Sequence, residues 1–281
     1  MTGKPWLRRL LPVASILVVL VLWQVLVTVM DVDEFVLPAP SAIAAALLDN
    51  TGTLAENALT TLLELGVGYA LGVAVGLVLA VAMTVLPLFR LAVYPLVVAS
   101  QTIPKIAIAP LLILWFGVGL MPKVLVIALL AFFPVLINTV SGLESADRGQ
   151  LELLRSVNAN ARQVYLHVRL PAAVPFLFAG LKLALTVSVI GAIVGEWVAA
   201  NAGLGYLLIA FNASLQTREL FATLVVLVLI SSVTFLLISV VERRLSWEAR
   251  LRRTGGGTVN ARGSGRGRQR TAPPDPLREQ M

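Results

Sequence analysis

Long apolar runs alternate with short polar stretches along the chain, and the length of these runs predicts their structure. A helix of about 20 apolar residues spans the ~30 Å hydrocarbon core of a bilayer. Six segments fit this pattern: 13–30, 65–86, 91–118, 124–140, 176–195 and 220–241. The third is longer than the others and contains three prolines and a lysine. The pattern therefore predicts an all-α integral membrane protein with about six transmembrane helices.

The two ends of the chain differ from this apolar core. Residues 1–12 include Lys4, Arg8 and Arg9, and residues 242–281 are rich in Arg, Gly and Pro. The C-terminal segment has too few apolar residues to bury a core, so we expect a disordered tail. The first apolar run is longer than the core of a signal peptide, and we expect it to be retained. The predicted organisation is an N-terminal segment (1–12), a transmembrane domain (13–241) and a basic tail (242–281).

Composition argues against several classes of function. Of the 281 residues, 58% are hydrophobic and 13% are charged, whereas about 25% charged residues are usual in soluble domains. There is no cysteine and a single histidine, His167, so we expect neither a thiolate nucleophile nor a metal site built from Cys or His. The net charge of +7 is concentrated in particular loops and the tail. We therefore expect a lipid bilayer as the partner of this chain, and no nucleic acid.

The connections between the apolar runs differ in charge. Residues 31–58 include five acidic and no basic side chains, whereas residues 142–175 include four arginines and residues 243–253 five more. Basic loops are retained in the cytosol. We therefore predict a multi-pass cell-membrane protein with both termini in the cytoplasm, the acidic connection outside and the arginine-bearing loop inside. An even number of spans is consistent with both termini on one side.

The stretch LELLRSVNANARQVYLHVRLPAAVPF (residues 151–176) is a polar island between two of the most apolar runs. Arginines recur every seven residues, at 148, 155, 162 and 169, and apolar residues recur at spacings of three and four. This pattern is typical of an amphipathic helix, which can lie on a membrane, pack under the spans or dock into another protein. Asn158 tolerates the left-handed conformation that ends a helix, so we predict two short helices with a bend there. Pro171 is expected to stop the second helix before the next span. The bend favours docking into a partner.

These residues resemble the EAA loop of bacterial ABC importer permeases. The family pattern is Glu-Ala-Ala, then a glycine six residues after the Glu, then Ile-x-Leu-Pro ending thirteen residues after the glycine. Glu152, Asn158 and Pro171 have this spacing, although Leu153-Leu154 replaces Ala-Ala and Asn158 replaces the glycine. Asn is the next-best residue for a positive φ angle.

The resemblance extends over residues 35–248. The segments FVLPAPSAI, TIPKIAIAPLLILWFGVGLMPKV, AFFPVLINTVSGL and GAIVGEWVAANAGLGYLL are similar to the nitrate/sulfonate/taurine branch, which includes importers of thiamine-precursor pyrimidines and riboflavin. The resemblance implies a bacterial inner-membrane permease that works as a dimer, expected to be a homodimer, with two cytosolic ATPase subunits and an extracytoplasmic substrate-binding protein. It also implies that the loop docks into the ATPase through the following residues: Glu152, Leu153, Leu154, Asn158, Arg162, Leu170 and Pro171.

The chain itself is not expected to be an enzyme. It contains no G-x-x-x-x-G-K-[ST] phosphate-binding loop, and its only Gly-Lys pair is Gly3-Lys4. ATP and magnesium are therefore expected to bind the partner ATPase, with no cofactor in this chain.

Three further residues are candidates for the translocation pathway. Lys105 lies within the third apolar run beside Gln101, so it either lines a polar cavity at a helix break or extends to the lipid headgroups. Glu196 ends the fifth run, where the resemblance places it near an external gate, the alternative being a solvated loop acid.

One helix is predicted to pack closely against another through four glycines that line one of its sides: Gly66, Gly68, Gly72 and Gly76.

Other functions remain open from the residues alone. A secondary transporter or channel also has about six spans, but we find no internal repeat of the kind expected there. An intramembrane enzyme is expected to carry HExxH, GxSxG or paired acids, which the chain lacks. A structural scaffold leaves the bent loop unexplained. The substrate is either a small aromatic heterocycle, which the TIPK and GEWV segments favour by resemblance, or a small anion, which Lys105 suits.

Overall fold

The computed structural model describes residues 5–199 and 201–254. Most of the predicted tail and the first residues of the N-terminal segment lie outside the described residues. The chain divides into two units, Met1–Glu242 and Arg243–Met281, and the fold below is that of the first. In the second unit, the described residues 243–254 are helical. We predicted disorder from residue 242, but the helix continues past that residue. Each residue added to an existing helix gains one hydrogen bond, which favours this extension.

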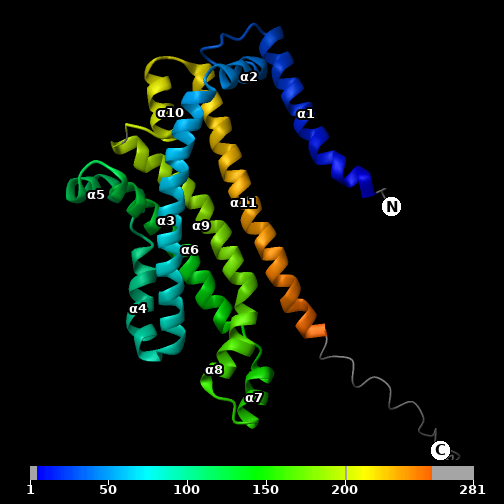
Figure 1. Cartoon of the computed structure of the whole chain (residues 1–281), viewed down its shortest axis with the longest axis vertical. Helices are drawn as coiled ribbons and strands as arrows, with labels where there is room; N and C mark the ends of the chain where they lie inside the picture. Colours follow the sequence, from blue (N-terminus) through cyan, green and yellow to red (C-terminus); the bar gives the residue numbers. More distant parts are fainter. Residues whose placement is uncertain (1–4, 200, 255–281) are drawn as a thin grey trace, which may run out of the picture. The chain divides into compact units, whose positions relative to one another are not determined.

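The described residues form helices joined by short turns, with no strand among them (Figure 1). The elements are α1 (Pro5–Val29), α2 (Pro40–Asp49), α3 (Thr51–Val85), α4 (Pro87–Ser100), the 3₁₀ turn η1 (Lys105–Ile108), α5 (Ala109–Phe116), α6 (Leu120–Glu144), α7 (Arg148–Ser156), α8 (Ala161–Val164), the π turn η2 (Tyr165–Arg169), α9 (Leu170–Ala199), α10 (Leu204–Ala213) and α11 (Thr217–Thr254).

Each of the six apolar runs forms helix, the third with a break in it, and the all-α membrane fold is confirmed. Four continuous helices are long and apolar enough to cross a membrane: Thr51–Val85, Leu120–Glu144, Ala161–Val198 and Thr217–Arg244. The third predicted run is a broken pair, α4 and η1–α5, bent by 89°, which counts as a fifth span if taken as one. The apolar part of α1, Val13–Val29, is shorter. Many large apolar side chains in these helices are exposed, Val78 by 67% for example, as expected of a surface covered by lipid.

Helix α6 occupies the centre of the bundle, between α3 and α9. Gly68, Gly72 and Gly76 of α3 face it, and a β-carbon placed on Gly72 would lie 2.5 Å from the Ala128 carbonyl oxygen. The two backbones therefore meet without intervening side chains, as small residues at four-residue spacing allow. The prediction for Gly66 was wrong, because open space surrounds it. Its position, two residues from Gly68, places it on another side of the helix.

The α6–α9 contact also depends on glycine. Gly142 of α6 lies against Ala173 and Phe176 of α9, and Gly180 of α9 lies against Pro134 and Asn138 of α6. Because these contacts recur along both helices, α6 and α9 form one closely packed pair.

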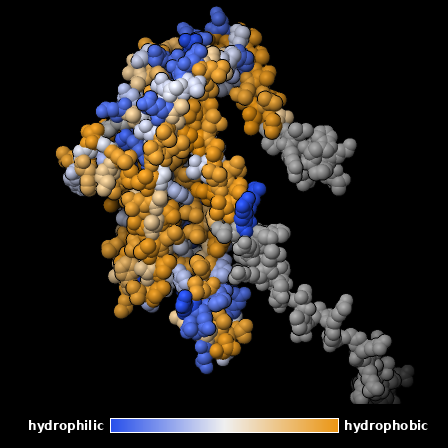
Figure 2. All heavy atoms as spheres, viewed as in Figure 1, coloured by the Kyte–Doolittle hydropathy of each residue, from blue (hydrophilic) through white to orange (hydrophobic). Residues whose placement is uncertain are grey.

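The bundle has two ends, which we name by the short helices found there. The α7 end contains the end of α3, the end of α6 and the start of α9; the α10 end contains the start of α3, the start of α6 and the end of α9. Figure 2 shows hydrophobic residues over most of the visible face, with hydrophilic residues gathered around α7–α8 and at the opposite end. This is the distribution expected of a helical bundle with lipid around its middle and water at its ends.

Two short helices at the α10 end were not predicted. We predicted only an acidic connection over residues 31–58, but they contain α2 and the first turns of α3. Helix α10 likewise follows the end of the fifth run. Their apolar residues, Ile43, Leu204 and Leu207 among them, are buried in one cluster with Leu54, so these helices close the bundle at this end.

The close contact at Gly72 predicts a specific loss of stability. Gly72→Ala places a methyl group against the Ala128 carbonyl and Ala131, and overpacking of this kind costs about 1–3 kcal/mol. Gly66→Ala is the matched control, because it adds the same methyl group to the same helix in open space. Thermal unfolding in detergent is expected to show a lower Tm for Gly72→Ala alone. Equal Tm values for the two variants would contradict the close approach of α3 and α6.

Candidate functional site

Helix α7 begins the polar loop that joins α6 to α9. Asp147 caps it, since its carboxylate accepts a hydrogen bond from the Gln150 backbone N–H at 2.9 Å. This cap satisfies one of the free N–H groups at the start of the helix. The loop therefore starts at a defined residue.

The loop bends at Asn158, as the sequence predicted. Asn158 has a φ of 54°, its N–H donates to the Arg155 carbonyl at 3.0 Å, and the Ala159 N–H donates to the Leu154 carbonyl at 2.9 Å. These two bonds are the Schellman motif, which ends a helix with a left-handed residue. Asn takes the place of glycine because its side chain tolerates that conformation.

A second cap starts the next helix two residues later. Asn160 and Gln163 form a capping box, in which each side chain accepts a hydrogen bond from the other's backbone N–H, at 2.9 and 2.8 Å. The loop is thus two short helices, α7 and α8, with defined ends and only four residues between them. The predicted helix–bend–helix arrangement is confirmed.

The prediction that Pro171 stops the second helix was wrong. The helical backbone continues from Ala161 to Val198 and passes through the π turn η2 just before the proline. A proline lacks an N–H, and its ring clashes with the carbonyl four residues earlier, here that of His167. The wider π turn accommodates the ring. The loop is therefore continuous with the span α9.

The loop residues differ in exposure. Leu151 and Leu154 are half-buried, and Glu152, Asn158 and Arg162 are exposed. Two apolar side chains, Leu153 and Val157, are each 66% exposed. Leu170 is 40% exposed and Pro171 half-buried, where the loop joins α9. The predicted contact residues of α7 therefore form an accessible surface that combines apolar and charged groups.

Lys105 lies at the break between α4 and α5. As predicted, the helix is interrupted between Gln101 and Lys105. The Lys105 ammonium lies 4.4 Å from the centre of the Phe133 ring of α6 and 3.3 Å from the Gln101 carbonyl oxygen, a cation–π geometry. Gln101 is exposed and Lys105 half-buried. A role for these two residues in a solute pathway stays a prediction.

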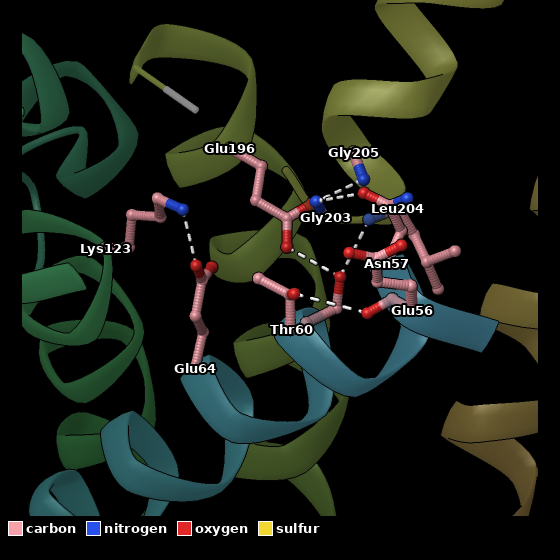
Figure 3. Close-up of polar contacts among 10 residues, drawn as sticks. Glu56, Asn57, Thr60, Glu64, Lys123, Glu196, Gly203, Leu204 and Gly205 are labelled. Carbon is pink, nitrogen blue, oxygen red and sulfur yellow. Dashed lines mark hydrogen bonds and ion pairs between the residues drawn. The ribbon is translucent and has the colours of Figure 1, made fainter. Parts of the chain in front are cut away.

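Glu196 is buried within a polar cluster at the α10 end (Figure 3). One carboxylate oxygen accepts a hydrogen bond from the Thr61 hydroxyl at 2.7 Å, and the other accepts one from the Gly205 N–H. The Thr61 oxygen in turn accepts the Leu204 N–H at 2.8 Å. With 1% of its surface exposed, Glu196 is not a solvated loop acid. It joins the end of α9 to α3 and to the first turn of α10.

The same cluster contains an ion pair that sequence reasoning missed. Lys123 of α6 and Glu64 of α3 are both buried and paired with each other. Figure 3 shows the Glu64 and Glu196 side chains directed toward the same space. We call Thr61, Glu64, Lys123 and Glu196 the polar cluster.

A signal for this pair was present in the sequence. Each residue lies one position before an apolar run, Glu64 before 65–86 and Lys123 before 124–140. Opposite charges at the starts of two spans are a hint of pairing, but only if the two starts meet at the same end of the bundle.

Comparison with known proteins decides the family. Residues 72–247, more than half of the chain, match the family described as "Binding-protein-dependent transport system inner membrane component". The chain belongs to this family. It is an ABC transporter permease subunit and a multi-pass protein of the inner membrane.

Relatives of this permease include named transport permeases. It is 40% identical over 247 residues to the riboflavin transport system permease protein RibX of Chloroflexus aurantiacus, covering 87% of this chain and 92% of that protein. It is 36% identical over 239 residues to the formylaminopyrimidine transport permease protein ThiX of Halalkalibacterium halodurans, covering 85% and 95%. The fold is similar to the MetNI methionine ABC transporter in an inward-facing conformation, with a TM-score of 0.60, 22% identity and coverage of 72% and 98%.

The buried ion pair of the permease predicts that removing one of its charges lowers stability more than removing both. Lys123→Met leaves the Glu64 carboxylate buried without its partner, and breaking such a pair costs about 3–5 kcal/mol. The double variant Glu64→Leu/Lys123→Met removes both charges and is expected to recover most of this loss. Unfolding in detergent–SDS mixtures measures both.

The control is Lys182→Met, which breaks the half-buried pair between Lys182 and Glu242. It is expected to cost less, because solvent reaches that pair. If Lys123→Met were as stable as the double variant, the buried Glu64 carboxylate would not need the Lys123 ammonium, and the prediction would be contradicted.

Proposed function

We propose that this permease is the membrane subunit of an ATP-driven importer, in which it forms a homodimer with two cytosolic ATPase subunits at the α7 end. A substrate-binding protein delivers the solute at the α10 end. ATP and magnesium bind the ATPase, and this chain contributes no cofactor site. The family assignment supports the transport role, and the surface of α7 is the observation that carries the coupling role.

Helix α7 has the properties of a docking element. Leu153 and Val157 expose apolar surface next to Glu152, Arg148 and Arg155. The caps at Asp147 and Asn158 fix the ends of the helix, so little conformational entropy is lost when a partner binds. An apolar centre with a charged rim is typical of a protein interface.

The charges at the two ends support the proposed orientation. Arg90, Arg148, Arg155 and Arg162 lie at the α7 end, and the acidic residues of the segment 31–56 precede or begin α3 at the other. Because basic residues are retained on the cytoplasmic side, we place α7 and both chain termini in the cytoplasm, and α10 outside.

For the substrate we favour a small aromatic heterocycle. Two relatives carry names for riboflavin and formylaminopyrimidine transport, and both solutes are planar and conjugated. A small anion is the second candidate, favoured by the Lys105 ammonium at the helix break. Titration of the partner binding protein with riboflavin, a formylaminopyrimidine and an aliphatic sulfonate distinguishes the two classes.

The coupling role predicts an effect of α7 variants on ATP hydrolysis. In reconstituted complexes with the ATPase and the loaded binding protein, Leu153→Asp or Glu152→Ala is expected to reduce substrate-stimulated ATPase activity and transport at least several-fold. Leu153→Asp places a charge in an apolar contact, and an unpaired charge is costly to desolvate. The permease itself is expected to fold normally, because both side chains are exposed.

Leu88→Ala is the matched control, since this leucine is 83% exposed at the same end of the bundle but lies outside the loop. It is expected to have little effect. Unchanged stimulation in both α7 variants would contradict the coupling role. Solute movement by the purified permease alone would instead indicate a secondary transporter or channel.

A further inference from the structure

An open cavity of about 710 Å³ lies at the α7 end, bordered by the end of α3, the start of α4, the end of α6 and the polar loop. Its charged and aromatic lining is formed by Arg90, Tyr94, Glu144 and Arg169. The volume lies within the range of about 300–1,000 Å³ that is usual for small-ligand sites. Neither the coupling surface of α7 nor the polar cluster involves these four residues.

Two of the charges in the cavity neutralise each other. Arg90 forms an ion pair with Glu144, with one nitrogen–oxygen distance of 2.9 Å. The Arg90 guanidinium also lies 5.8 Å from the centre of the Tyr94 ring. Arg90 is therefore held in place from two sides, and the pair adds no net charge.

Arg169 is the remaining charge. It is half-buried at the end of the π turn η2, and its guanidinium makes no ion pair or hydrogen bond with the residues that the structure describes. Placing an arginine in a partly apolar cavity without a counter-ion costs free energy. A ligand with a negative charge removes this cost, and the planar guanidinium suits the two oxygens of a phosphate.

The rest of the lining is apolar. Leu91 and Pro95 line the cavity along α4, and Met83 and Leu143 line it at the ends of α3 and α6. These residues lie near the ends of membrane-spanning helices, which is the depth of lipid headgroups and of the first part of the acyl chains. A free anion satisfies Arg169 alone, whereas a phospholipid also covers the apolar wall.

We infer that this cavity binds an anionic phospholipid, with the phosphate at Arg169 and an acyl chain along Leu91 and Pro95 of α4. Basic pockets between transmembrane helices bind anionic headgroups in this way. The lipid contacts both the α4 helix and the polar loop, so its binding links the composition of the adjacent leaflet to the position of the loop. The proposed lipid site is the same whichever leaflet surrounds the α7 end, and it does not require that an ATPase docks there.

Lipid binding to the purified full-length permease tests this inference. Native mass spectrometry with phosphatidylglycerol and phosphatidylcholine of equal chain length is expected to show at least tenfold tighter binding of phosphatidylglycerol. Arg169→Gln is expected to remove most of this preference. Arg148→Gln is the matched control, an exposed arginine of the same loop that does not line the cavity, and is expected to change the affinity less than twofold.

A second variant tests the apolar wall without changing charge. Leu91→Trp partly fills the cavity from α4, where Leu91 is 74% exposed, and is expected to weaken phosphatidylglycerol binding while the Tm in detergent stays unchanged. Equal affinities for the two lipids, or an unchanged preference in Arg169→Gln, would overturn the inference. Competition by millimolar inorganic phosphate, together with binding that is insensitive to Leu91→Trp, would reassign the site to a free anion and overturn it as well.

Discussion

The direct contact of helix backbones around α6 is the constraint on which the rest of the structure depends. Gly68, Gly72 and Gly76 of α3 meet α6 on one side, and α9 meets it through Gly142, Gly180 and Gly191 on another. In lipid there is little hydrophobic gain from bringing two apolar helices together, so close van der Waals packing of this kind provides the attraction. Packed interiors resist deformation, and the three helices therefore move as one body.

This body connects the two ends of the bundle. The polar loop follows α6 directly, and its second helix, α8, continues into α9 without a break. At the far ends of the same two helices lie Lys123 and Glu196, which are bonded to α3 and to the first turn of α10. In the coupling role that we propose, a displacement of α7 by a partner passes along α6 and α9 to the polar cluster and α10. The helix break at Lys105 also packs against this body, because the Lys105 ammonium lies over the Phe133 ring of α6 and Ala109 is buried against Val126.

Much of the fold was predictable because its signals are local. An apolar run predicts a membrane helix from its own length, and Asn158 predicted the bend because few residues tolerate a positive φ angle. The pairing of Glu64 with Lys123 was not predictable in this way, since it joins residues 59 positions apart whose proximity depends on the packing of α3 and α6. Helices α2 and α10 escaped notice because they are short and are buried by contacts with several other helices, among them α3, α9 and α11. Pro171 misled the prediction because a π turn removes the clash that normally ends a helix.

The central claim is that the polar loop lies in the cytoplasm, where an ATPase reaches it, and that α10 lies outside. The chain has no cysteine, so single cysteines report their location without background. Ser156→Cys places a thiol on the exposed loop, and Ser214→Cys places one on the exposed turn after α10. A membrane-impermeant maleimide applied to spheroplasts is expected to label Ser214→Cys at once, and Ser156→Cys only after permeabilisation. Labelling of Ser156→Cys in intact spheroplasts would contradict the account.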